Sequence, residues 1–348
     1  TIKLDGNYPT GTDNVALGDT ALDSVQSGGI NNTVIGSKAG TAITTGDSNT
    51  AVGHEALKAN TTATGNTAIG ADALLSNVDG GNNTAVGLCS LRNNSTGGNN
   101  TAIGFRAGED TTGGQNTALG SCALFDNSSG DNNTAIGKEA LANNTTAANN
   151  TAVGALALLA NTTGTLNVAV GVNALAANTT ADFNTAIGTC SMLTNITGEE
   201  NTAVGFNSLK TSTVSNNTAF GSQSLRGTTT GVDNTAVGRD AMKSNTTGCR
   251  NVAVGASALC SNISGGFNTA VGFQSSLTNT TGTLNSSFGD NSLRCNTTGA
   301  NNTGLGTSAL FNNTTASFNT AVGSEALSTN TTGASNTAVG RLALKANT

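Results

Sequence analysis

The sequence predicts an all-β fold, a β-solenoid (β-roll) of about twenty coils with seventeen residues each. A glycine that closes an Asn-Thr-Ala-Val-Gly segment recurs twenty times, and sixteen of the nineteen intervals between copies are seventeen residues long. The residue four places before this marker glycine is Asn in every copy, and the residue directly before it is always apolar. Aromatic residues make up only 3% of the 348 residues, so an ordinary globular core is not expected.

Each coil is expected to begin with a short strand at the Asn-Thr-Ala-Val segment. Side chains alternate along a strand, so Thr and Val share one face and Ala takes the other. We expect the Val column (the residue directly before each marker glycine) and the Leu column (four residues after it) to fill the interior. One coil buries too little to offset its chain entropy, so coils must stack. The predicted core includes Val52, Ile69, Val86, Leu57, Leu74 and Leu91.

The marker glycine and the invariant Asn predict a turn and a ladder. An invariant glycine indicates a backbone angle or a close approach that a Cβ atom would forbid. Stacked Asn side chains can satisfy their donors and acceptors on the next coil. The predicted structural turns include Gly53, Gly70, Gly87 and Gly104. The predicted ladder includes Asn66, Asn83, Asn133 and Asn150.

The Ala column, two residues before the marker glycine, predicts a parallel homotrimer. Ala lies opposite the Val face, so it would point out of the coil, where only contact with another backbone requires a small residue. An apolar stripe on a lone chain is expected to find a partner. An alternative arrangement turns Ala inward and places Val between chains. The predicted interchain residues include Ala51, Ala68, Ala85 and Ala102.

The Asn-Thr-Ala-Val-Gly-x-x-Ala-Leu signature, as in residues 49–57 or 319–327, resembles two related families. One is the head repeat of trimeric autotransporter adhesins, which has a shorter coil. The other, closer in coil length, is the repeat of fibre proteins from tailed bacteriophages, marine ones especially. The resemblance covers Asn14 to Leu344 and implies a left-handed β-roll with three chains side by side.

The domain organisation predicted from the repeat is one elongated array. Residues 1–13 are expected to form an N-terminal segment or cap, and residues 14–348 a continuous solenoid. Because the chain stops inside a repeat, we expect it to be a fragment of a longer fibre.

No catalytic, cofactor-binding or metal-binding residues are predicted, and the protein is not expected to be an enzyme. His54 is the only histidine and lacks motif partners, and no C-x-x-C spacing joins the six cysteines, which we expect to be small half-buried residues. Glu109-Asp110 and Glu199-Glu200 are expected on a solvated edge. The net charge of −6 carries no basic block for nucleic acid, and no apolar run suits a membrane span.

Phenylalanines recur in two columns. One column follows the marker glycine, and the other directly precedes the invariant Asn. This recurrence indicates packing rather than a ligand platform, and contact between chains is one form of it. The first column holds Phe105, Phe206 and Phe273, and the second Phe183, Phe267 and Phe318.

The leading functional hypothesis is the structural shaft of a virion tail fibre or a surface adhesin stalk. It would lie on a virion or extracellular surface, assemble with itself and other fibre or virion proteins, and project a receptor-binding tip on a flanking domain. A second hypothesis is an ice-binding solenoid, which requires a Thr column that faces solvent. A third is a glycosylated extracellular filament of a eukaryotic microbe, suggested by sequons such as Asn60-Thr61-Thr62 and Asn144-Thr145-Thr146.

Overall fold

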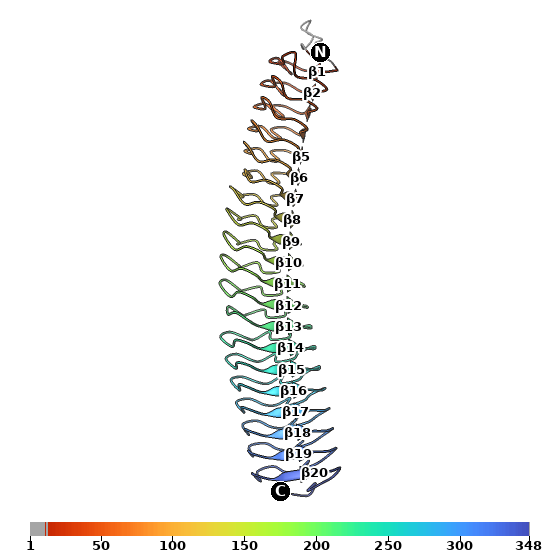
Figure 1. Cartoon of the computed structure of the whole chain (residues 1–348), viewed down its shortest axis with the longest axis vertical. Helices are drawn as coiled ribbons and strands as arrows, with labels where there is room; N and C mark the ends of the chain where they lie inside the picture. The colour runs from red at the N-terminus through yellow and green to blue at the C-terminus, as the bar shows by residue number, and fades with distance from the viewer. Residues whose placement is uncertain (1–10, 12, 348) are drawn as a thin grey trace. The chain divides into compact units, whose positions relative to one another are not determined.

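The computed structural model describes residue 11 and residues 13–347, which form an all-β solenoid without a helix (Figure 1). The prediction of the fold class is therefore confirmed. Contacts divide the chain into two compact units: unit 1 runs to Asn173 and includes Asn178–Thr180, and unit 2 comprises Ala174–Ala177 and the residues from Ala181. Apart from Gly11 and Asp13, the predicted N-terminal segment 1–13 lies outside the described residues.

Every strand has three residues and comes from one Thr-Ala-Val segment or its equivalent. Unit 1 contains β1 (Val15–Leu17), β2 (Thr33–Ile35), β3 (Thr50–Val52), β4 (Thr67–Ile69), β5 (Thr84–Val86), β6 (Thr101–Ile103), β7 (Thr117–Leu119), β8 (Thr134–Ile136), β9 (Thr151–Val153) and β10 (Val168–Val170). Unit 2 contains β11 (Thr185–Ile187), β12 (Thr202–Val204), β13 (Thr218–Phe220), β14 (Thr235–Val237), β15 (Val252–Val254), β16 (Thr269–Val271), β17 (Ser286–Phe288), β18 (Thr303–Leu305), β19 (Thr320–Val322) and β20 (Thr337–Val339).

Within each unit, consecutive strands pair in parallel with equivalent residues opposite one another. In unit 1, Ala68 of β4 lies opposite Ala85 of β5, and in unit 2, Ala236 of β14 lies opposite Ala253 of β15. The coils of sixteen residues keep this register, since Thr101 of β6 still lies opposite Thr117 of β7. Each column of the sequence repeat is therefore a row of side chains along its unit.

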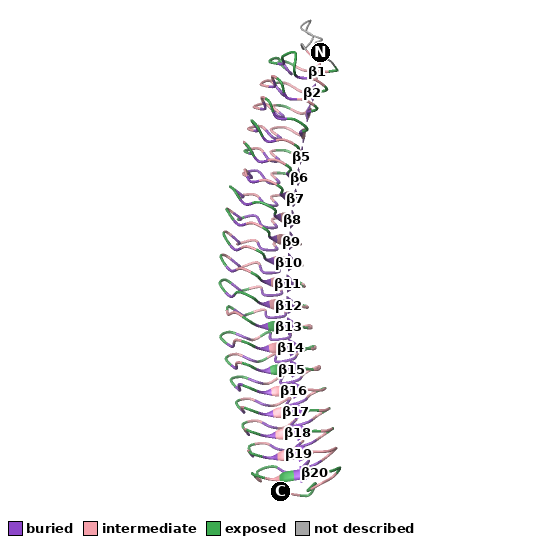
Figure 2. Cartoon of the chain, viewed as in Figure 1, coloured by how far each residue is buried: buried purple, intermediate pink, exposed green. Residues whose placement is uncertain are grey.

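The interior of each coil contains the Ala and Leu columns together with asparagines (Figure 2). The predicted core positions Leu57, Leu74 and Leu91 are confirmed, because each is at most 1% exposed. Leucines in this column adopt left-handed backbone angles, with φ of 54° at Leu57. These residues stay in a conformation that is unfavourable for leucine because their side chains fill the core.

The predicted orientation of the strands was wrong. Alanines of the Ala column, predicted to lie between chains, are instead buried inside the coil. The Val column, predicted to be core, faces outward: Val52 and Val86 are half-buried, and Ile69 is 40% exposed. The buried alanines include Ala51, Ala68, Ala85 and Ala102.

The reason for the small residue lies within the chain. At Gly304, which replaces Ala in β18, an added Cβ would lie 2.5 Å from Ser292 Oγ and 3.5 Å from Leu293 Cγ on the opposite wall. Only a small side chain fits between the strand and that wall. One coil departs from the pattern and supports this explanation. There Val34 takes the Ala position and Gly40 replaces the Leu, so the larger residue on the strand faces a smaller one. A Cβ on Gly40 would lie 3.2 Å from Val34 Cγ2.

The predicted glycine turns are confirmed. Gly53, Gly70, Gly87 and Gly104 have φ between 135° and 141°, a region that only glycine occupies readily. A Cβ on Gly53 would lie 2.4 Å from the carbonyl oxygen of Gly70 on the next coil. The close stacking of the coils and the backbone angle therefore both exclude other residues here.

The predicted asparagine ladder is also confirmed, and Asn66, Asn83, Asn133 and Asn150 are at most 1% exposed. The bond that joins successive coils runs from backbone to side chain: the Asn83 amide N–H donates to Asn66 Oδ1 at 2.9 Å, and Asn150 N–H to Asn133 Oδ1 at 3.0 Å. Each step satisfies a buried backbone donor that faces no strand partner.

A second ladder was not predicted. It contains the asparagines seven residues after the marker glycine. Their amides bond directly to one another, with Asn77 Nδ2 3.1 Å from Asn60 Oδ1 and Asn144 Nδ2 2.8 Å from Asn127 Oδ1. The sequence feature that indicates this ladder is the high frequency of Asn in the column, since stacked asparagines can satisfy one another's buried polar groups.

Candidate functional site: the outer strand face

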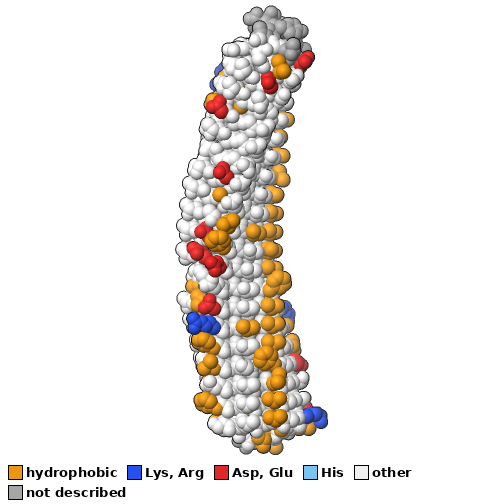
Figure 3. Space-filling model, viewed as in Figure 1, with side chains coloured by type: hydrophobic (Ala, Val, Ile, Leu, Met, Phe, Trp, Pro, Cys, Tyr) orange, Lys and Arg blue, Asp and Glu red, His pale blue; other side chains and the backbone are white. Residues whose placement is uncertain are grey.

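The candidate site is the outer face of the strands, here called the strand face, made of the outward Thr and Val columns. The alternation of the strand places these two columns side by side because Ala occupies the interior. Within each unit, Figure 3 shows a row of hydrophobic side chains next to a mostly white row of side chains that are neither hydrophobic nor charged. The more exposed members are Ile35, Ile69, Ile103 and Leu119 in unit 1 and Ile187, Phe220, Val237, Val254, Phe288, Leu305 and Val339 in unit 2.

The Thr column contributes hydroxyl groups to the same face. Thr84, Thr134 and Thr151 are half-buried, and their hydroxyls donate to no other described residue. By contrast, the Thr145 and Thr162 hydroxyls, on another side of the coil, donate to the Thr162 and Thr179 carbonyls of the next coil. The hydroxyls of the strand face are therefore available to water or to a partner.

The residue directly before each ladder asparagine forms a further outward column, here called the edge column. Its backbone is left-handed in both units, with φ of 60° at Asn82 and 59° at Phe267. In unit 1 it is mostly polar, as at Asn99 and Asn132, which are exposed. In unit 2 it holds the exposed residues Phe183, Phe267, Leu284 and Phe318. The predicted packing role of these phenylalanines is not met within the chain, since they are 52% to 63% exposed.

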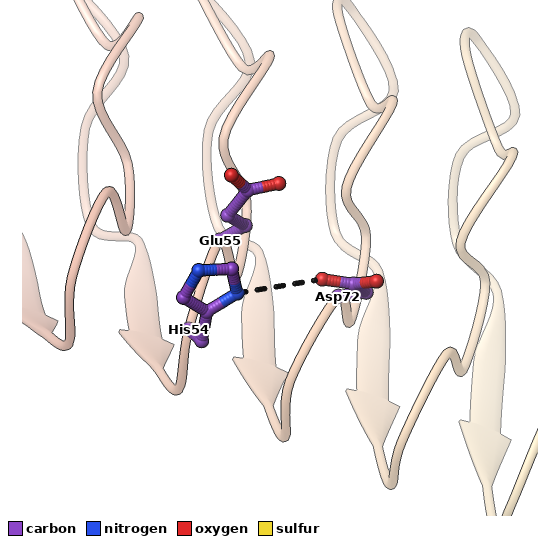
Figure 4. A group of neighbouring side chains, drawn as sticks. All are labelled: His54, Glu55 and Asp72. Carbon is purple, nitrogen blue, oxygen red and sulfur yellow. Dashed lines mark ion pairs between the residues drawn. The ribbon is translucent and has the colours of Figure 1, made fainter.

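His54, Glu55 and Asp72 form the one group among the described residues that could offer three ligands to a metal ion (Figure 4). His54 Nδ1 lies 3.9 Å from Asp72 Oδ1, on the adjacent coil. Glu55, however, already accepts Lys38 at 3.3 Å and Lys58 at 3.1 Å.

Asp72 also has a cationic partner, since Arg92 Nε lies 3.7 Å from Asp72 Oδ2. Two carboxylates are thus matched by three cations, which disfavours a divalent ion. The hydrogen bond from Lys58 lowers the pKa of Glu55, as expected for a carboxylate in such a network. We interpret the group as a surface ion-pair network.

All six cysteines are free and half-buried, as predicted. Burial raises the pKa of the Cys89 and Cys260 thiols, which keeps them protonated and poorly reactive at neutral pH.

The expectation of a solvated carboxylate pair was wrong at Glu109, which is 5% exposed. Its carboxylate accepts a hydrogen bond from Arg106 Nε and lies 3.9 Å from Arg92. Glu109 therefore belongs to the ion-pair network, while Asp110 beside it is half-buried and Glu199 and Glu200 are exposed.

The sequons divide into two kinds. Asn60 and Asn144 belong to the second ladder, are fully buried, and use their side-chain nitrogens in hydrogen bonds, so they offer no glycan acceptor in the folded chain. The sequons that begin at Asn82 and Asn149 of the edge column are exposed. The sequons that begin at Asn93 and Asn143, directly before the second ladder, are exposed as well, so a glycosylated filament would carry its glycans on these two outward columns.

No protein-family model matches the chain, and no curated protein is similar to it. Among the described residues, no helix has the length and apolar character to cross a membrane. The repeat and its geometry must therefore support any functional proposal.

Proposed function

We propose that the chain is the structural shaft of an extended fibre, a virion tail fibre or a surface adhesin stalk, assembled as a parallel homotrimer. In this role the array is a spacer on a virion or extracellular surface, other fibre or virion proteins join it, and receptor binding resides on a flanking domain. The chain itself performs no catalysis. The resemblance of its repeat to phage fibres and trimeric adhesins supports this source.

The observation that carries the proposal is the outward Val column. In each unit, almost every coil places an aliphatic or aromatic side chain on the strand face, with the same parallel register throughout. Ten coils at about 4.8 Å per step give an apolar row about 43 Å long in one unit. Exposed apolar surface of this extent indicates an interaction site.

The partner that fits this row is a second copy of the chain. A partner that meets a side chain at every coil must repeat at the same interval, and a parallel copy does so. Copies related by rotation about a common axis form closed assemblies rather than open ones. The residues that would join the copies are therefore those of the Val column instead of the Ala column, and the proposed assembly is still a trimer.

Sedimentation equilibrium on the full chain and on the variant V237T/V254T/V271T tests the proposal. Thr has the same shape as Val and suits a strand, so each chain should stay folded. We expect the parent protein to sediment as a trimer and the variant to dissociate at the same concentration. A parent protein that stays monomeric and soluble would refute the proposal.

Ice binding is a second candidate, and one observation favours it. The Thr column faces outward, as an ice-binding surface of Thr residues requires. Thr hydroxyls in parallel register beside Val methyl groups form a regular uncharged surface that could order water. The test is thermal hysteresis of the full chain: ice binding requires activity in the monomer, and its loss in T84K/T101K/T117K.

A further inference from the structure

We infer that Phe267, Leu284 and Phe318, here called the edge patch, form the second contact edge through which unit 2 binds another copy of this chain. This inference rests on the proposed self-association and identifies the residues that complete it. The three side chains are 52%, 53% and 63% exposed and belong to the coils of β16, β17 and β19.

The fold does not require these residues. The edge position has a left-handed backbone, with φ of 59° at Phe267, 57° at Leu284 and 62° at Phe318. Asn and Gly adopt this conformation readily, whereas bulky residues do so with strain. Unit 1 uses Asn at five such coils, among them Asn82 and Asn149.

The side chains of the edge patch are also not explained by packing within the chain. The backbone N–H groups of Phe267 and Leu284 bond to the Cys249 and Gly266 carbonyls of the preceding coil, which holds the backbone in place whatever the side chain. The one ring contact is Arg250, whose guanidinium lies 5.4 Å from the Phe267 ring centre. A strained position that holds an exposed apolar residue indicates a function outside the chain.

The edge patch lies on the same side of the coil as the strand face. In the coil of β16, Phe267, Thr269 and Val271 are exposed or half-buried and alternate with the buried Asn268 and Ala270, so all three point outward. In the part of the chain that holds unit 2, Figure 3 shows hydrophobic side chains along two margins with white side chains between them. The Val column and the edge column are here called the two margins of this surface.

The symmetry of a ring explains why a second apolar margin strengthens the contact. In a ring of three parallel copies, each contact is heterologous, so one margin of a copy meets the opposite margin of the next. A polar opposite margin places polar surface in this contact, whereas an apolar one extends the apolar area that the Val column begins. In unit 2 the edge column is apolar at Phe183, Phe267, Leu284 and Phe318 and polar at its other coils, whereas in the described part of unit 1 its one exposed apolar residue is Leu166.

The size of the contact supports the same conclusion. The Val column alone, about 43 Å long and about 7 Å wide in one unit, offers roughly 300 Å². Stable interfaces bury about 800 Å² on each partner. Complete burial of a Phe covers on the order of 150–250 Å², and about half of each edge-patch side chain is still exposed, so the three together add roughly 300 Å².

The test is sedimentation equilibrium on the full chain carrying F267N/L284N/F318N. Asn suits the left-handed backbone, so the dissociated variant should melt no earlier than the dissociated parent protein, as followed by circular dichroism. We expect its dissociation constant to rise at least tenfold. The matched control L88N/F105N/V172N removes three exposed apolar residues from the column after the glycine in unit 1 and should change association less than threefold.

The outcomes separate the two proposals. A trimer that F267N/L284N/F318N leaves as tight as the parent protein would overturn this inference and leave the proposed shaft standing. An equal loss of association in the control would also overturn it, because the contact would then not be specific to the edge patch. A monomeric parent protein would contradict the proposed function itself.

Discussion

The two units have the same interior and differ on the outside. Leu141 in unit 1 and Leu259 in unit 2 are both fully buried, and so are Ala135 and Ala253 in the strands of the same coils. The edge column, by contrast, is mostly polar in unit 1 and partly aromatic in unit 2, where eight of the ten phenylalanines also lie. The fold therefore fixes the inward columns, and the outward columns are free to differ according to what binds there.

The largest expected effect tests whether the interiors are equivalent. Leu141→Ala and Leu259→Ala each remove a fully buried side chain from a narrow core and should each cost about 2–5 kcal/mol. Urea unfolding of the dissociated chain measures both. A loss confined to one unit would show that the interiors are not equivalent.

The ladder should be nearly as sensitive. Asn133→Leu removes the Oδ1 acceptor of the Asn150 N–H and leaves buried donors without partners, at a cost of about 1–3 kcal/mol. The neighbouring Asn132→Gly changes an exposed side chain on a left-handed backbone and should be close to neutral. An unchanged melting temperature in Asn133→Leu would count against the ladder.

Exchanging edge residues between the units gives a smaller effect of opposite sign. Asn149→Phe places a bulky residue on a left-handed backbone in unit 1 and should destabilise the dissociated chain by about 1 kcal/mol. Phe318→Asn in unit 2 should stabilise it by a similar amount. If both changes destabilise, the phenylalanines contribute to folding within the chain, and the comparison of the units fails.

The smallest effect concerns the ion pairs at Glu55 in unit 1 and Glu325 in unit 2. Hydrogen bonds from Lys58 and Lys345 lower the pKa of these carboxylates from their ordinary value of 4.5. A lowered folded-state pKa gives stability that is present above pH 4.5 and is lost as the pH falls through the folded-state value.

Glu55→Gln and Glu325→Gln should therefore be slightly less stable than the parent protein at pH 7. Both differences should shrink as the pH falls toward 3, because the carboxylates of the parent protein then become protonated and lose the same charge. Urea midpoints at the two pH values measure this, and a difference that is as large at pH 3 as at pH 7 would point to packing instead.

Most of the fold could be predicted from the sequence because the repeat occurs twenty times, so the residues that each position accepts can be compared. The marker glycine and the ladder at Asn66 and Asn83 each have a physical requirement that no other residue meets in this repeat, and the Leu column requires a large apolar side chain, which Met192 and Met242 also supply. The direction of the strand could not be predicted in this way. Alternation says only that Ala and Val point to opposite sides, and either side can explain a small residue.

The sequence contains one pair of compensating residues that indicates which way the strand side chains point. Val34 and Gly40 exchange size in one coil, which indicates that the Ala position faces the Leu position, but a single pair is hard to recognise among twenty coils. The candidate site could be predicted only in part for the same reason. Apolar and Thr columns were visible in the sequence, but which of them faces outward depends on that direction.

Native mass spectrometry of the full chain tests the central claim, that the outer strand face joins copies of the chain. The proposed shaft predicts a dominant species at three times the chain mass of 34.0 kDa, with V237T/V254T/V271T shifted to single chains under the same conditions. A dominant soluble species at 34.0 kDa for the parent protein would contradict it.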